Sequence, residues 1–94
     1  MITFKRTVRT ASSERFLGVM EGADALAVDL HYLPNGVVAG TVIILDGAPI
    51  TDEEIPGLLQ QLDDDMLPGV DLETGSLSFT VVRGRVVGNF EPEA

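Results

Sequence analysis

The segment ALAVDLHYLPNGVVAGTVIIL, residues 25–45, constrains the fold of this chain more than any other part of the sequence. Pro34, Asn35 and Gly36 suit a tight turn, because proline presets the first φ angle and glycine readily adopts the left-handed conformation that closes the turn. Apolar residues alternate on both sides of this tripeptide, as they do in strands. The segment therefore predicts a β-hairpin with a three-residue loop.

The hydrophobic pattern selects one register for this hairpin. With Leu33 opposite Val37, each opposed pair on one face is apolar or contains glycine: Tyr32 with Val38, Leu30 with Gly40, Val28 with Val42, and Leu26 with Ile44. A slip of one residue would place Leu30 opposite Thr41 and break the match. Because residues 37–45 are apolar on both faces for most of their length, we expect this strand to lie inside the sheet.

Two strands are predicted before the hairpin. Residues 2–9 alternate between apolar and polar side chains, with Arg6 interrupting the apolar face, and this pattern suits an edge strand. Residues 11–14, ASSE, predict a turn, and the apolar run FLGVM (16–20) predicts the strand that returns from it.

A single helix is predicted over about residues 52–66. Thr51 and Glu54 have the spacing of a capping box, and acidic residues follow Thr51, as a helix N-terminus favours. Pro56 is best tolerated in a first turn, so the regular helix is expected to begin near Ile55. One apolar stripe follows at helical spacing: Ile55, Leu58, Leu59, Leu62 and Met66.

A final hairpin is predicted after the helix. The runs SLSFTVV (76–82) and RVVGNFE (85–91) flank Arg83 and Gly84, and pairing the two runs places their apolar residues on one face. The last residues, 91–94, are expected to be disordered.

These elements predict one α+β domain over residues 1–94. Its core is a twisted antiparallel sheet of five to six strands, arranged as two or three hairpins, with the single helix packed on one face. One short helix covers only part of such a sheet. We therefore expect apolar sheet surface to remain available for association with a second copy of the chain.

The charge of the chain is unevenly distributed. The net charge is −9, and the sequence between Phe16 and Val82 holds twelve acidic residues without one lysine or arginine. Such a surface repels nucleic-acid phosphates and anionic lipids, so we expect neither nucleic acid nor a membrane as a partner. The sequence has no cysteine, no pattern of a secretory signal peptide and no apolar run of membrane-spanning length, so a cytoplasmic protein is expected.

The acidic residues near the end of the helix form the first candidate site: Asp63, Asp64, Asp65, Asp71 and Glu73. On a helical wheel the three consecutive aspartates spread over the solvent-facing half of the last turn, so they do not converge as metal ligands must. The spacing of a calcium-binding EF-hand loop is also missing. We therefore predict no metal and no cofactor, and interpret the cluster as a surface for a basic protein partner.

A second candidate site is the polar sheet face formed by Asp29, His31 and Thr41. Asp29 and His31 point to the same side of one strand, where a carboxylate can orient an imidazole as a general base. Thr41 is expected diagonally across from His31. The sequence provides no motif for a nucleophile beside them, so an enzyme is not the favoured interpretation.

Three functional hypotheses follow from these features. The favoured one is a non-enzymatic protein–protein interaction module whose acidic middle segment meets a basic partner. The first alternative is a structural protein that self-associates through exposed sheet. The second alternative is a small enzyme or ligand-binding domain that uses the Asp29, His31 and Thr41 face.

Overall fold

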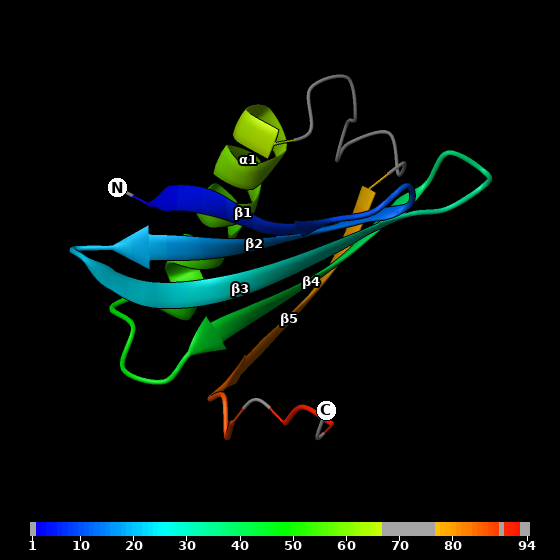
Figure 1. Ribbon diagram of the computed structural model, residues 1–94. Coiled ribbons are helices and arrows are strands. Elements are labelled where there is room, and N and C mark those ends of the chain that lie inside the picture. The colour runs from blue at the N-terminus through cyan, green and yellow to red at the C-terminus, as the bar shows by residue number, and fades with distance from the viewer. Residues whose placement is uncertain (1, 67–76, 89, 93–94) are drawn as a thin grey trace.

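A computed structural model describes residues 2–66, 77–88 and 90–92 of the chain. Its strands are β1 (Thr3–Arg9), β2 (Ser13–Met20), β3 (Ala23–Tyr32), β4 (Val38–Leu45) and β5 (Leu77–Gly84), and its helices are a 3₁₀ helix (Asp52–Glu54) and the α-helix α1 (Ile55–Met66). The five strands form one sheet in the order of the sequence, and α1 lies against one face of it (Figure 1). The predicted α+β class, with a single helix packed on a sheet, is confirmed.

β3 and β4 pair in the predicted register. Their opposed residues are Leu26 with Ile44, Val28 with Val42, Leu30 with Gly40, and Tyr32 with Val38. The loop closes through a hydrogen bond from the Leu33 amide to the Val37 carbonyl at 2.9 Å, and Gly36 adopts a φ of 85°. β4 also pairs with β5 on its other edge, so it lies inside the sheet as predicted.

The core lies between α1 and the sheet face that it covers. Alternate residues of β2, β3 and β4 are buried on this face together with Leu58 and Leu62 of α1. Ile55 and Leu59 are partly buried against the same core. The apolar stripe of the helix is therefore confirmed as far as its side chains are described.

The second face of the sheet has no helix over it in the described part of the chain. Leu17, Ala27 and Ile43, which alternate with core residues along their strands, are partly exposed on this face. The single helix thus covers one face only.

The helix begins as its sequence predicts. The Glu54 carboxylate accepts hydrogen bonds from the backbone amide and from the hydroxyl of Thr51, each at 2.9 Å. These hydrogen bonds lower the pKa of Glu54. The α-helix starts at Ile55, directly before Pro56, after the 3₁₀ turn.

No helix within the described ranges is long and apolar enough to cross a membrane.

The predicted final hairpin is wrong. β5 continues through Arg83 and Gly84 instead of turning there, and it pairs in parallel with β4, so the sheet is mixed. None of the described residues after β5 lies in a strand. β4 has a second edge to pair, and the crossover through α1 delivers β5 to that edge in the parallel direction. Arg–Gly is also a weak hairpin turn, because two-residue turns favour two residues that accept positive φ.

Arg83 ties the end of β5 to the start of the helical region. Its guanidinium donates a hydrogen bond to the Asp52 carboxylate at 2.6 Å and another to the backbone carbonyl of Ile50 at 2.9 Å. One side chain therefore holds the start of the crossover against the C-terminal end of β5, at the position where the sequence had predicted a turn.

Gly40 makes room for an aromatic ring on the helix-side face of the sheet. A Cβ atom at Gly40 would lie 2.5 Å from Cδ1 of Phe79 and 3.1 Å from Cδ2 of Leu30. The first distance is far below the ~3.5–4 Å of a favourable carbon–carbon contact. The Phe79 ring therefore packs directly on the backbone of β4.

We expect Gly40→Ala to lower the free energy of unfolding by about 1–3 kcal/mol, because the added methyl group displaces the Phe79 ring or shifts a strand. Gly84→Ala is the matched control, because no atom lies within 4 Å of the corresponding Cβ position. Urea denaturation of both variants measures the difference. A Gly40→Ala variant as stable as the parent chain would contradict the packing described above.

Candidate functional site

The turn between β2 and β3 carries a charged side chain at the end of the sheet. Met20 pairs with Ala23, and the two residues between them, Glu21 and Gly22, have φ angles of 52° and 80°. Positive φ at both central residues is typical of a type I′ turn, which suits the twist of a hairpin. Glycine adopts this conformation freely, whereas a left-handed backbone costs a residue such as glutamate about 1–2 kcal/mol.

A pocket of about 490 Å³ lies between this turn and the loop that follows β4. Figure 1 shows the turn and the loop at the same end of the sheet. Glu21, Asp24 and Asp46 line the pocket together with apolar residues that include Met20 and Ala48. We call this site the acidic pocket.

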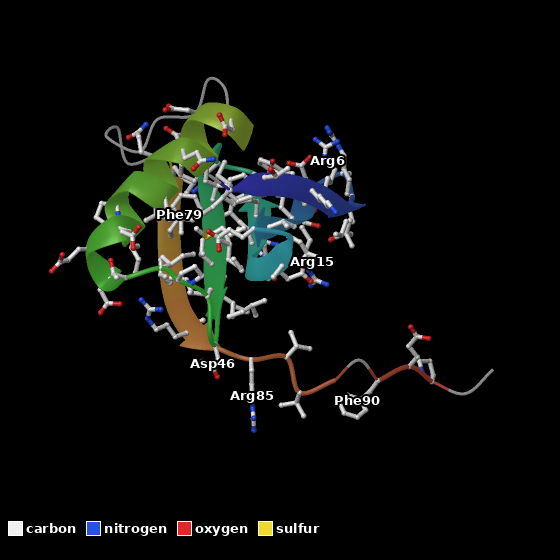
Figure 2. The ribbon with its side chains drawn as sticks, turned by 90° about the vertical axis from the view of Figure 1, so that its left-hand side faces the viewer. Arg6, Arg15, Asp46, Phe79, Arg85 and Phe90 are labelled. Atoms are coloured by element: carbon white, nitrogen blue, oxygen red, sulfur yellow. The ribbon has the colours of Figure 1, made fainter. Side chains whose placement is uncertain are left out.

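Most of the arginines make ion pairs within the chain. Four of the five make ion pairs: Arg6 and Arg9 with Glu14, Arg15 with Asp29, and Arg83 with Asp52. The three carboxylates of the acidic pocket, by contrast, form no ion pair with any residue that the structure describes. The three carboxylates of the pocket are therefore left without an ion pair among the described residues. Arg85, the fifth arginine, lies near Asp46, whose amide donates a hydrogen bond to the carbonyl of Gly84 (Figure 2).

The carboxylates of the acidic pocket are distributed around it and do not gather on one point. Across residues 2–66, 77–88 and 90–92, no three His, Cys, Asp or Glu side chains converge closely enough to hold a metal ion. The pocket thus suits a ligand that meets the carboxylates separately, such as an organic cation.

Asp63 does not share the exposed surface of the other described aspartates at the end of α1. Asp64 and Asp65 are exposed, as predicted, but Asp63 is only 7% exposed, and its Oδ1 has no hydrogen-bond partner among the described residues. The prediction that all three aspartates face solvent is wrong for Asp63. A residue on the flank of an apolar stripe follows the tilt of the helix on the sheet, which periodicity alone does not specify. Asp71 and Glu73 lie outside the described residues.

The polar sheet face lies opposite the helix side of the sheet. Asp29 pairs directly with Thr41, and His31 is exposed beside Asp29. Asp29 and His31 line a groove of about 160 Å³ together with Ser13 and Arg15. The Asp29 carboxylate accepts a hydrogen bond at 2.6 Å from Arg15. The Asp29 carboxylate, which the sequence had suggested as the group that orients His31, is therefore bound by Arg15.

A buried glutamate is fully engaged within the chain. Glu14 is 6% exposed, accepts a hydrogen bond from the Tyr32 hydroxyl, and lies 3.1 Å from Arg6 and 3.3 Å from Arg9. The Arg6 guanidinium also sits 5.7 Å from the centre of the Phe16 ring, within reach of a cation–π interaction. Because each partner of Glu14 comes from the same chain, we assign this cluster to the stability of the fold.

The sequence alone did not single out Glu21, Asp24 and Asp46 as a candidate site. One signal was available for two of them. Extending the hairpin register that pairs Leu26 with Ile44 by two residues brings Asp24 opposite Asp46. The position of Glu21 depends on the turn conformation, which the Glu–Gly dipeptide suggests only weakly.

No family model and no curated protein matches the sequence. Among solved structures, the chain is similar to the crystal structure of ribosomal-protein-alanine N-acetyltransferase from Brucella melitensis biovar Abortus 2308. The sequence identity is 15% and the TM-score 0.40, covering 92% of this chain and 74% of that chain. So distant a similarity says nothing about the chemistry of this chain.

The Glu14 cluster predicts an unusual titration of Tyr32, the one tyrosine in the sequence. The pKa of Tyr32 is raised from 10.0 to about 12. The largest cause is burial, followed by the hydrogen bond to Glu14 and the negative charge of Glu14, while the positive charges of Arg9 and Arg6 lower the pKa by less. The phenol ionises more readily in the unfolded chain, so its contribution to stability is complete below pH 10 and is lost as the pH rises toward 12.

Ultraviolet absorbance of the phenolate measures this pKa directly. We expect Glu14→Gln to lower the pKa of Tyr32, although not fully to 10.0, because burial remains. Asp24→Asn, in the acidic pocket away from the Glu14 cluster, is the control and is expected to leave the titration of Tyr32 unchanged. A wild-type tyrosine that titrates near pH 10.0 would contradict the cluster.

The burial of Asp63 predicts a difference between neighbouring aspartates. Asp63→Asn is expected to raise the free energy of unfolding by about 1 kcal/mol, because it removes a buried carboxylate whose Oδ1 has no hydrogen-bond partner among the described residues. Asp64→Asn is expected to change it by no more than about 0.5 kcal/mol, because Asp64 is exposed and its hydrogen bond from Gln60 can persist. Thermal denaturation compares the two, and a destabilised Asp63→Asn would mean that its carboxylate has a partner.

Proposed function

We propose that this chain is a non-enzymatic protein-interaction module that binds a basic partner, and that the acidic pocket receives a lysine or arginine side chain of that partner. The observation that carries this proposal is the set of carboxylates of Glu21, Asp24 and Asp46, which form no ion pair with any described residue, in a chain where four of the five arginines are paired internally. A cationic group is the ligand that such a pocket attracts.

The apolar part of the pocket suits the same ligand. Lysine and arginine pack their aliphatic stems on apolar surface while the charged end stays near polar groups. Met20, Ala48 and Pro49 provide that surface beside the carboxylates. The volume of about 490 Å³ also lies within the range of pockets that hold small ligands, so one long side chain fits.

The backbone at Glu21 supports a role for its side chain. Asparagine or glycine would adopt a φ of 52° at lower cost, so glutamate makes this turn less stable than it could be. Left-handed residues other than glycine occur preferentially at binding sites, where the surrounding structure compensates for the strain. In this proposal the strained turn is kept because it places the Glu21 carboxylate at the rim of the acidic pocket.

The exposed aspartates of α1 have a different part in this proposal. Asp64 and Asp65 stand at the end of the helix, away from the 3₁₀ turn that adjoins the pocket loop (Figure 1). Charges at a distance from a binding site mainly raise the rate of association with an oppositely charged partner. They therefore attract a basic partner without holding its side chain.

The proposal is tested with a peptide of alternating glycine and arginine, and with the matching glycine–citrulline peptide as the control. Citrulline keeps the shape of arginine without its charge. Isothermal titration calorimetry at low ionic strength is expected to detect binding of the arginine peptide only, and this binding is expected to weaken as salt is added.

Glu21→Asn combined with Asp24→Asn is expected to weaken peptide binding at least about fivefold, because two exposed charge pairs together contribute about 1 kcal/mol. The same variant is expected to unfold at a higher temperature, since asparagine suits the turn. Asp64→Asn combined with Asp65→Asn removes equal charge and is expected to have a smaller effect on affinity. Equal losses in the two variants would contradict the pocket as the site, and binding that ignores salt would contradict the whole proposal.

A further inference from the structure

The chain leaves a group of apolar side chains exposed directly after β5. Val86 is 65% exposed, Val87 84% and Phe90 88%. Figure 2 shows this part of the chain leaving the sheet, with Phe90 pointing away from the helix and the strands. We call residues 85–88 and 90–91 the C-terminal segment.

The C-terminal segment has the composition of a strand but no strand partner among the described residues. It follows directly on β5, whose outer edge pairs with no strand that the structure describes. Its valines and phenylalanine favour extended structure. An open edge continued by exposed apolar residues is a typical place for strands of two chains to pair.

We propose that the C-terminal segments of two copies of this chain pair as antiparallel strands around a two-fold axis at Gly88. In this register Arg85 of one copy opposes Glu91 of the other, and Val86 opposes Phe90. Each contact occurs twice, because a two-fold interface is self-complementary. A slip of one residue would set Arg85 opposite Phe90 and lose both matches.

The side chains of the segment agree with this pairing. Cζ of Phe90 lies 3.4 Å from the position that a Cβ at Gly88 would occupy, so Phe90 and Gly88 share one side of the segment. Because Gly88 has no side chain, the space at the two-fold axis is free for the aromatic rings of both copies. Two strands alone are only marginally stable, so we expect a reversible dimer that depends on concentration.

This inference does not rest on the proposed function. None of the residues of the C-terminal segment lines the acidic pocket, and self-association is measured without a basic peptide. The two proposals can therefore fail separately.

Sedimentation velocity of the whole chain over a wide range of concentrations tests the inference. The 10.0 kDa chain is expected to move from monomer to dimer as its concentration rises. Arg85→Glu alone and Glu91→Arg alone are each expected to raise the concentration at the midpoint about tenfold, because each places two like-charged pairs across the interface. Circular dichroism checks that both variants fold, as exposed positions outside the core should allow.

A mixture of the two variants provides the sharpest measurement. In the proposed register, a chain with two acidic ends pairs with a chain with two basic ends, so an equimolar mixture is expected to recover the association of the parent chain. A parent chain that stays monomeric at every concentration overturns the inference. So does a dimer that neither substitution weakens, or a mixture that associates no better than its components.

Discussion

β4 is apolar on both faces, and its burial is the constraint on which the rest of the structure depends. Val42 and Ile44 have no exposed surface, which requires cover from α1 on one face and a strand on each edge. β3 reaches one edge through a tight turn. The other edge is left for a strand from later in the chain, and the connection to that strand passes through α1 over the covered face. The mixed sheet, the position of the helix and the free edge of β5 all follow from this requirement.

Structural features that are set by residues close together in the sequence could be predicted from the sequence. The register of β3 with β4 followed from the turn at Pro34–Gly36, and the start of α1 at Ile55 followed from Thr51, Glu54 and Pro56. The direction of β5 could not be predicted, because an alternating strand looks the same in parallel and antiparallel pairs. The burial of Asp63 depends on the tilt of α1. For the acidic pocket, the hairpin register could have placed Asp24 opposite Asp46, but the position of Glu21 depends on a turn conformation that the sequence suggests only weakly.

The ion pairs connect stability with the surface that remains for binding. Arg6, Arg9 and Arg15 make ion pairs with Glu14 on β2 and Asp29 on β3, so much of the positive charge of β1 and β2 is engaged within the sheet. The turn end of the sheet and the end of α1 have no such compensation among the described residues. Four of the five arginines thus contribute to the fold, and the proposed binding of a basic partner depends on carboxylates that lie outside these ion pairs.

The parallel docking of β5 also bears on the order in which the chain folds. β1 to β4 form a meander in which each strand pairs with the next, so their contacts are local and close short loops. Val38 and Leu77, by contrast, meet only after the chain has crossed the sheet through α1, and the entropy of closing that long loop is recovered only when the helix has docked. β5 is therefore expected to be the last strand to join and the first to detach. The C-terminal segment reaches its position only after β5 has docked. Association of two copies through this segment would therefore select correctly folded chains.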